Sequence, residues 1–332
     1  MRERYIDIVK GMSILCIVLL HYLNGLFPTV FHTFVGSFMI TSFYVCTGWV
    51  SAQHTSSRTI KEFIHKRFKQ LGIPYLYWTG IILFFDSILW LCGYYDTFFL
   101  GKEIYKSMVL RGCGTLWFLP AMFLGGIIWQ FLSEKKRVYI VLAFIITIVY
   151  GVLYDYLMDD ANQVFANATI RDIVNAPLRV IRDALQAWVA IAFGYYTYLA
   201  SKRIINKRGI LFSLSLIFLL LAYYFANYYP FNINFAWSYL APLLGPLGWI
   251  YFYKSIQNLS IWTYFNYWGK NSLCLMVTHY SIILVLFKTF VTSVLHMPFD
   301  GWTSFVAFLI SLPIQHLIVI LTNKYASYTL AK

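Results

Sequence analysis

Long runs of apolar residues, separated by short polar or basic segments, extend along almost the whole chain. A run of about twenty apolar residues is long enough to cross a lipid bilayer as an α-helix. We count about ten such runs, at residues 6–26, 31–52, 71–93, 116–132, 138–157, 184–199, 210–229, 235–253, 272–291 and 302–321. The pattern therefore predicts an all-α, polytopic membrane protein of about ten transmembrane helices.

Composition agrees with this prediction. The chain has 332 residues, of which 60% are hydrophobic and only 12% are charged, and a soluble domain of this size could not bury so much apolar surface. No low-complexity linker and no soluble domain is recognisable at either end. We therefore expect residues 1–332 to form a single transmembrane domain.

The distribution of basic residues predicts the orientation of the helices. If the N-terminus is cytoplasmic, 19 of the 26 Lys and Arg residues fall on the cytoplasmic side. The positive-inside rule then places both termini in the cytoplasm. The net charge of +13 marks this topology and does not indicate nucleic-acid binding.

The first apolar run carries three polar residues that share one side of the predicted helix. Asp7, Lys10 and His21 are costly inside a bilayer, by roughly 2.5–3.5 kcal/mol for a charged group near its centre. At about 100° per residue, Lys10 and His21 lie about 20° apart around the axis and about 16 Å apart along it. Asp7 lies about 60° from Lys10 and is a candidate partner for Lys10 or Arg4. The three residues form a polar stripe that predicts a function.

His21 is the candidate catalytic residue of this stripe, with Asp7 grouped beside it. A neutral imidazole can take a proton from a hydroxyl group as that oxygen attacks a thioester. It can also accept the acyl group itself and pass it on. The residues leave both routes open, beside the simpler interpretation of a histidine that only bonds to a neighbouring helix.

Several short motifs appear in a characteristic order. Lys10 is followed eleven positions later by His21, and an aromatic-rich run at 42–48 closes in Thr-Gly. The other motifs are the basic run 66–75 that leads into Pro-Tyr, the segment 116–120 that begins Leu-Trp-Phe, and the segment 269–273 followed by His279. Together they make the chain resemble the type-three membrane acyltransferases, which O-acylate extracytoplasmic polysaccharides and related acceptors. Gln70 departs from this family, which often has a second arginine at that point.

The resemblance implies acetyl-CoA as the donor. No metal is expected, because the histidines outside these motifs have no carboxylate partners at the spacing of metal ligands. The resemblance also implies that a cation of the basic run contacts the donor phosphates at the cytoplasmic side, and Gln70 leaves open whether this is Arg67 or Lys69. Lys10 is a further candidate to clamp these phosphates, because its separation of about 16 Å from His21 is comparable with an extended pantetheine arm. His279, about a third of the way across its span, is expected to line the same donor tunnel or to serve in packing. For Arg67 and Lys69 the alternative is a topological role only, and for Lys10 it is an interfacial lysine whose amine reaches the headgroups.

Other basic residues gather on the predicted outer side. Arg111, Arg179 and Arg182 are candidates to hold an anionic saccharide or a lipid-linked precursor, and the alternative is anchoring to lipid headgroups. Trp117 is grouped with them and is expected to shape the wall of the cavity.

The sequence hypothesis is thus a bacterial inner-membrane O-acetyltransferase. It would move an acetyl group from cytoplasmic acetyl-CoA to a cell-surface polysaccharide or its lipid-linked precursor. The alternative is a non-enzymatic transporter or flippase of lipid-linked saccharides, although no paired repeats are visible. Membrane lipids are expected partners, nucleic acid is not, and the oligomeric state stays open.

Overall fold

The computed structural model describes residues 3–22, 26–53, 59–159, 164–165, 167–203, 207–228 and 239–331. Within these ranges the regular structure is entirely helical, and no strand is present among them. The predicted all-α class is confirmed.

Seven helical segments of the described chain are long and apolar enough to cross a membrane: Arg4–Tyr22, Thr29–Gln53, Ile60–Leu91, Arg137–Met158, Arg208–Asn227, Ser272–Val294 and Gly301–Tyr325. The predicted span at 116–132 appears as the shorter helix α7, Phe118–Ser133. The span at 184–199 lies within a 36-residue helix, α9 (Ala168–Arg203). The span at 235–253 falls partly outside the described residues, where α11 (Ala241–Ile256) begins later. The count of ten and the cytoplasmic termini therefore stay predictions.

The chain divides into two compact units. The first unit comprises Met1–Thr55 and Ala190–Tyr325, and the second comprises Ser56–Val189 and Ala326–Lys332. Helix α9 belongs to the second unit as far as Val189 and to the first unit from Ala190. The prediction of one transmembrane domain stays a prediction.

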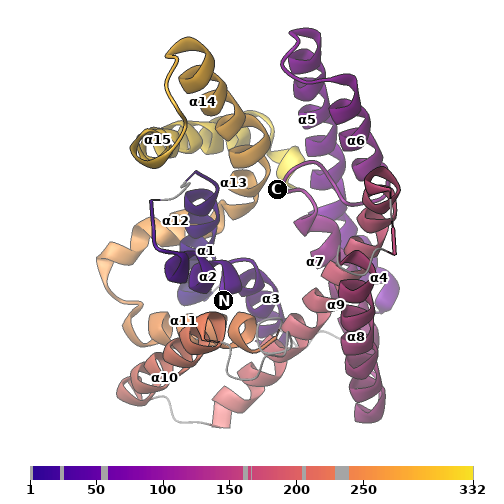
Figure 1. The fold of residues 1–332 in the computed structure, drawn as a ribbon. Helices are drawn as coiled ribbons and strands as arrows, with labels where there is room; N and C mark the ends of the chain where they lie inside the picture. The colour runs from indigo at the N-terminus through magenta and orange to yellow at the C-terminus, as the bar shows by residue number, and fades with distance from the viewer. Residues whose placement is uncertain are drawn as a thin grey trace. The chain divides into compact units, whose positions relative to one another are not determined.

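In the first unit, α1 (Arg4–Tyr22) packs along α12 (Thr263–Lys270) at very close range (Figure 1). A Cβ atom on Gly11 would lie 1.7 Å from the Phe265 carbonyl oxygen, and one on Gly269 would lie 1.7 Å from the Asp7 carbonyl oxygen. Only glycine permits two helix backbones to approach so closely, as at other small-residue interfaces in membranes. The two glycines therefore set the spacing and register of α1 against α12.

The rest of the first unit surrounds this pair. Its members include α2 (Thr29–Phe38), α3 (Thr41–Gln53), α10 (Arg208–Asn227), α11, η4 (Ser260–Trp262), α13 (Ser272–Thr278), η5 (His279–Leu284), α14 (Val285–Thr289), η6 (Phe290–Val294) and α15 (Gly301–Tyr325). Gly48 of α3 lies against α9, because a Cβ atom there would meet the Ile191 carbonyl oxygen at 1.8 Å. The buried Trp49 indole donates to the Tyr5 hydroxyl at 3.0 Å and ties α3 to α1. The glycine that closes the 42–48 motif thus has a packing role.

The second unit contains α4 (Ile60–Arg67), η1 (Phe68–Gly72), α5 (Ile73–Leu91), α6 (Thr97–Met108), α7, α8 (Arg137–Met158), the first part of α9 and η7 (Ser327–Leu330). A capping box between Thr59 and Glu62 begins α4. Helices α5 and α6 lie side by side (Figure 1), and the Tyr75 hydroxyl of α5 donates to the Ser107 carbonyl of α6 at 2.8 Å. The Trp188 indole joins α9 to α8 by donating to Thr147 at 3.0 Å.

Candidate functional site

His21 and His279 meet in the first unit. The His21 Nδ1 atom lies 3.3 Å from the His279 Nε2 atom, and the two ring centroids are 5.2 Å apart. His279 begins η5 and is fully buried, whereas His21, in the last turn of α1, is exposed at the protein surface. The pair therefore combines one accessible imidazole with one enclosed imidazole.

The meeting of these rings follows from the glycine contact between α1 and α12. Gly11 touches Gly269, and ten residues further along each chain segment lie His21 and His279. Ten residues of helix rise by about 15 Å, so two helical segments that run in the same direction bring both histidines to one level. In the candidate span Ser272–Val294, His279 lies about a third of the way along from Ser272. Its expected place in a donor tunnel stays a prediction.

The hydrogen bonds define which nitrogen of each ring carries a proton. His279 Nδ1 lies 2.7 Å from the Leu275 carbonyl oxygen, which can only accept, so this nitrogen carries the proton. A neutral His279 then has a lone pair on Nε2, and His21 must donate to it from Nδ1. His21 is left with a lone pair on Nε2. An imidazole held in this way is ready to accept a proton or to attack a carbonyl carbon.

The helix that carries His279 is held on its other side by α15. The Thr278 hydroxyl contacts the side-chain oxygen of Gln315 at 2.9 Å, and both residues are buried. At His279 the helix widens into a π-helical turn, a feature often found at functional sites. The Tyr280 ring packs edge-on to His21, with centroids 4.8 Å apart. These contacts restrict the rotation of both imidazoles.

The polar stripe of α1 lies on one unbroken helix. Lys10 is partly buried and Asp7 is 3% exposed, and both charges act on the nearby Cys46 thiol of α3. Arg4, a proposed partner of Asp7, donates hydrogen bonds to the Leu259 carbonyl oxygen and the Thr263 hydroxyl. The continuity of α1 retains the separation of about 16 Å between Lys10 and His21 along the axis.

Arg67 and Lys69 belong to the second unit. Arg67 ends α4 and lies over the Phe63 ring, 5.4 Å from its centroid. Lys69 lies in the π-helical segment η1 and is exposed. Their proposed role in contacting a donor stays a prediction.

Trp117 and Arg111 are brought together by the turn between α6 and α7. Gly112 and Gly114 have φ angles of 69° and 50°, so the chain reverses through the left-handed region that favours glycine. The Arg111 guanidinium lies 5.1 Å from the Trp117 ring centroid and donates to the Asp183 carboxylate at 3.0 Å. The Trp117 ring thus packs against the Arg111 guanidinium and helps hold it in position.

A cavity of about 630 Å³ lies in the second unit, between α6 and the start of α9. Two of the predicted residues, Arg111 and Arg179, line it. The third, Arg182, does not line it and instead pairs with Asp155 at 3.0 Å over the Tyr154 ring. The other polar residues of the lining were not predicted as site residues; they are Thr97, Lys102, Tyr105, Lys106, Thr169, Asp172 and Asn175. The sequence feature that could have indicated them is that the segments forming α6 and the start of α9 are both predicted on the outer side.

The class of protein is now defined. Several helices of the described chain are long and apolar enough to span a bilayer, so this is a multi-pass membrane protein. It carries a pair of histidines in contact. Residues 3–321 match the acyltransferase domain of the acyltransferase 3 family, so the chain belongs to that family. Comparison with curated proteins and with solved structures found no match.

Proposed function

We propose that the protein is an O-acetyltransferase in which His21 accepts the proton of the acceptor hydroxyl. Acyltransferase activity follows from the family; the donor, the acceptor and the catalytic residue are our inference. The observation that supports it is the His21–His279 contact, because it leaves a lone pair on His21 Nε2 at an exposed position.

In the proposed reaction, an acceptor hydroxyl oxygen attacks the thioester carbonyl carbon of acetyl-CoA. The hydroxyl proton passes to His21 Nε2, the carbon–sulfur bond breaks, and the departing sulfur takes the proton back from the imidazolium. The products are the acetyl ester and the free thiol of coenzyme A. His279 accepts from the His21 Nδ1–H throughout and so helps stabilise the imidazolium, as a carboxylate does in a Ser-His-Asp triad.

A covalent route uses the same atoms. His21 Nε2 would attack the thioester carbonyl carbon, the carbon–sulfur bond would break, and the coenzyme A thiolate would leave, giving an acetyl-imidazole. The acceptor hydroxyl would then attack the acetyl carbon, the carbon–nitrogen bond would break, and the hydroxyl proton would pass to the thiolate. Both routes need an unprotonated Nε2 on His21. The geometry therefore supports His21 in either role and leaves the choice to kinetics.

Lys10 is proposed to hold the donor phosphates. It lies on the same helix as His21, and their separation of about 16 Å is comparable with an extended pantetheine arm. A donor anchored at Lys10 would then place its thioester near His21. By the predicted topology Lys10 faces the cytoplasm and His21 lies toward the outer half, which fits acetyl-CoA inside and a polysaccharide or lipid-linked saccharide outside a bacterial inner membrane.

Acetyl-CoA binding to the purified full chain in nanodiscs tests the donor assignment. Lys10→Ala should weaken binding about 10-fold, because a charge-assisted hydrogen bond is lost. Lys288→Ala serves as the control, since Lys288 is an exposed basic residue of α14 in the same unit. No binding of acetyl-CoA by the unmodified protein would instead favour the transporter alternative, and equal affinities of Lys10→Ala and the unmodified protein would remove Lys10 from the donor site.

A further inference from the structure

We infer that the cavity of the second unit binds a saccharide carrying one acidic group. The inference rests on the proposed function, because it names the class of acceptor. The cavity volume of about 630 Å³ is within the range of small-ligand sites, which hold molecules of the size of a short oligosaccharide.

The charges of the lining leave one positive charge in excess. Four basic residues line the cavity, namely Lys102, Lys106, Arg111 and Arg179. Three are paired with carboxylates, in Lys102–Asp172 at 2.5 Å, Lys106–Glu103 at 2.7 Å and Arg111–Asp183 at 3.0 Å. Among the residues described, Arg179 is the lining cation to which the structure gives no ion pair.

The surroundings of Asp183 strengthen this account. Its carboxylate bonds to Arg111 and also interacts electrostatically with Arg179 and Arg182. Arg182 is paired with Asp155. Arg179 is exposed, and the one described carboxylate with which it interacts, Asp183, is already paired with Arg111. A ligand with one negative charge would complete the balance, whereas a ligand with several would face repulsion from the carboxylates already present.

The rest of the lining presents groups that suit sugar hydroxyls. The Lys102–Asp172 pair offers a donor and an acceptor side by side. The Asn175 Oδ1 atom accepts from the Tyr154 hydroxyl at 2.6 Å, which leaves the Asn175 amide N–H groups as donors. The Tyr105 hydroxyl is fixed on the Ile173 carbonyl at 2.7 Å, so its ring is held in place as an apolar surface for a sugar ring.

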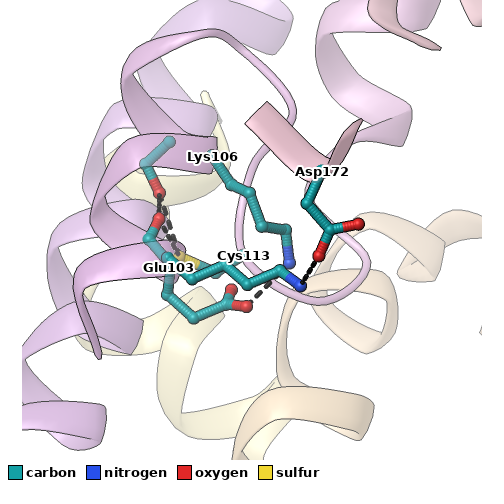
Figure 2. A network of polar contacts seen from close by, with 6 residues as sticks. Glu103, Lys106, Cys113 and Asp172 are labelled. Carbon is teal, nitrogen blue, oxygen red and sulfur yellow. Dashed lines mark hydrogen bonds and ion pairs between the residues drawn. The ribbon is translucent and has the colours of Figure 1, made fainter. Parts of the chain in front are cut away.

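Buried groups hold a polar network beside the cavity lining. Figure 2 shows Glu103, Lys106 and Asp172 converging from α6 and α9, with Cys113 beside them. Glu103 is buried, and the Cys113 thiol lies 3.0 Å from the Ser107 hydroxyl. A buried carboxylate paired with Lys106 keeps that ammonium directed to one place. The lining therefore has a fixed ammonium at Lys106 and an exposed aromatic ring at Phe98.

Binding of three oligosaccharides tests the inference, with the purified full chain in nanodiscs of neutral phosphatidylcholine and without acetyl-CoA. Sialyllactose carries one carboxylate, maltotriose carries none and trigalacturonate carries three. We expect sialyllactose to bind at least 10-fold more tightly than either of the others. Arg179→Gln should remove the preference over maltotriose, because the excess cation is lost.

Arg171→Gln is the matched control, since Arg171 lies on the same helix and does not line the cavity. Equal binding of the three sugars, or an equal loss in Arg171→Gln and Arg179→Gln, would overturn the inference. A third arm replaces part of the lipid with phosphatidylglycerol. If this lipid competes with sialyllactose, the cavity is a headgroup site and the inference is wrong.

The test separates this inference from the proposed function. His21→Ala should retain the preference for sialyllactose, because the cavity does not involve His21. If the preference is present but the unmodified protein transfers no acetyl group, only the proposed reaction is wrong. If acetyl transfer is normal and Arg179→Gln leaves the acceptor KM unchanged, only the cavity assignment is wrong.

Discussion

The histidine pair of the first unit and the cavity of the second unit are built in different ways. Helix backbones in contact position the pair, because α1 and α12 meet through Gly11 and Gly269, and one ring is fully buried. Side-chain ion pairs position the polar groups of the cavity, and one of them, Lys102–Asp172, is exposed. Backbone contacts of this kind fix atoms more closely than exposed ion pairs, which contribute only about 0–1 kcal/mol each.

This difference fits a division between chemistry and recognition. Proton transfer requires a base within hydrogen-bond distance of the reacting group, and a small displacement of the base is costly. Recognition of a flexible saccharide tolerates a more open site. Substitutions in the first unit should therefore change the rate of transfer, and those in the cavity should change the affinity for the acceptor.

The largest effect is expected for His21→Ala. Acetyl transfer should fall about 10³-fold, because the group that accepts the hydroxyl proton is removed. The measurement is transfer of labelled acetyl from acetyl-CoA to the native polymer by the purified protein. His316→Ala is the control, since His316 is an exposed histidine of α15 in the same unit. Normal transfer by His21→Ala would disprove the catalytic assignment.

A smaller loss is expected at His279, which acts through His21. His279→Ala should reduce the rate constant kcat about 10- to 100-fold with little change in KM, because His21 loses the acceptor that fixes its protonation. His279→Gln should recover part of this rate, since a glutamine carbonyl can accept from His21 Nδ1–H. If the glutamine variant is no better than the alanine variant, His279 serves only in packing.

Gly11→Ala should disturb the pair from a distance. The new methyl group would overlap the Phe265 carbonyl oxygen, forcing α1 and α12 apart at a cost above the roughly 1–3 kcal/mol typical of overpacking. We expect a fall of several degrees in the apparent unfolding temperature and a reduced kcat, measured by thermal unfolding and acetyl transfer. Gly36→Ala is the control, because a Cβ atom at that position would meet no other atom within 4 Å. Equal stability of the two variants would contradict the proposed role of the glycine contact.

The smallest effect is expected at Cys113, whose thiol should react slowly with an alkylating reagent. Cys113 is buried, and burial raises the pKa of its thiol to about 12. At pH 8 roughly one thiol in 10⁴ is then ionised, and reactivity should rise only as the pH approaches 12. Alkylation followed by mass spectrometry should label the exposed Cys92 first. Rapid labelling of Cys113 at pH 8 would contradict the burial of this thiol.

The helical class and the first helix could be predicted from sequence because both depend on local patterns. Apolar runs define helices, and the positions of Lys10 and His21 on one face follow from helix geometry alone. The family followed from short motifs in order, and the match over residues 3–321 confirms it.

Contacts between distant segments could not be predicted in the same way. The partner of His279 depends on the register between α1 and α12, which two glycines 258 residues apart determine. The contact of the Trp117 ring with the Arg111 guanidinium depends on a turn with positive φ angles at Gly112 and Gly114. The cavity needs α6 and the start of α9 to lie together, and no local pattern specifies that contact.

The protonation of His21 is the most direct test of the central claim. Solid-state NMR of the full chain labelled with ¹⁵N-histidine reports which ring nitrogens carry protons, and His21→Ala identifies the His21 signals by their loss. We predict a proton on Nδ1 and none on Nε2 of His21, with Nδ1 of His279 also protonated. A proton on His21 Nε2 in the resting protein would contradict the account, because that nitrogen could then neither accept a proton nor attack the thioester.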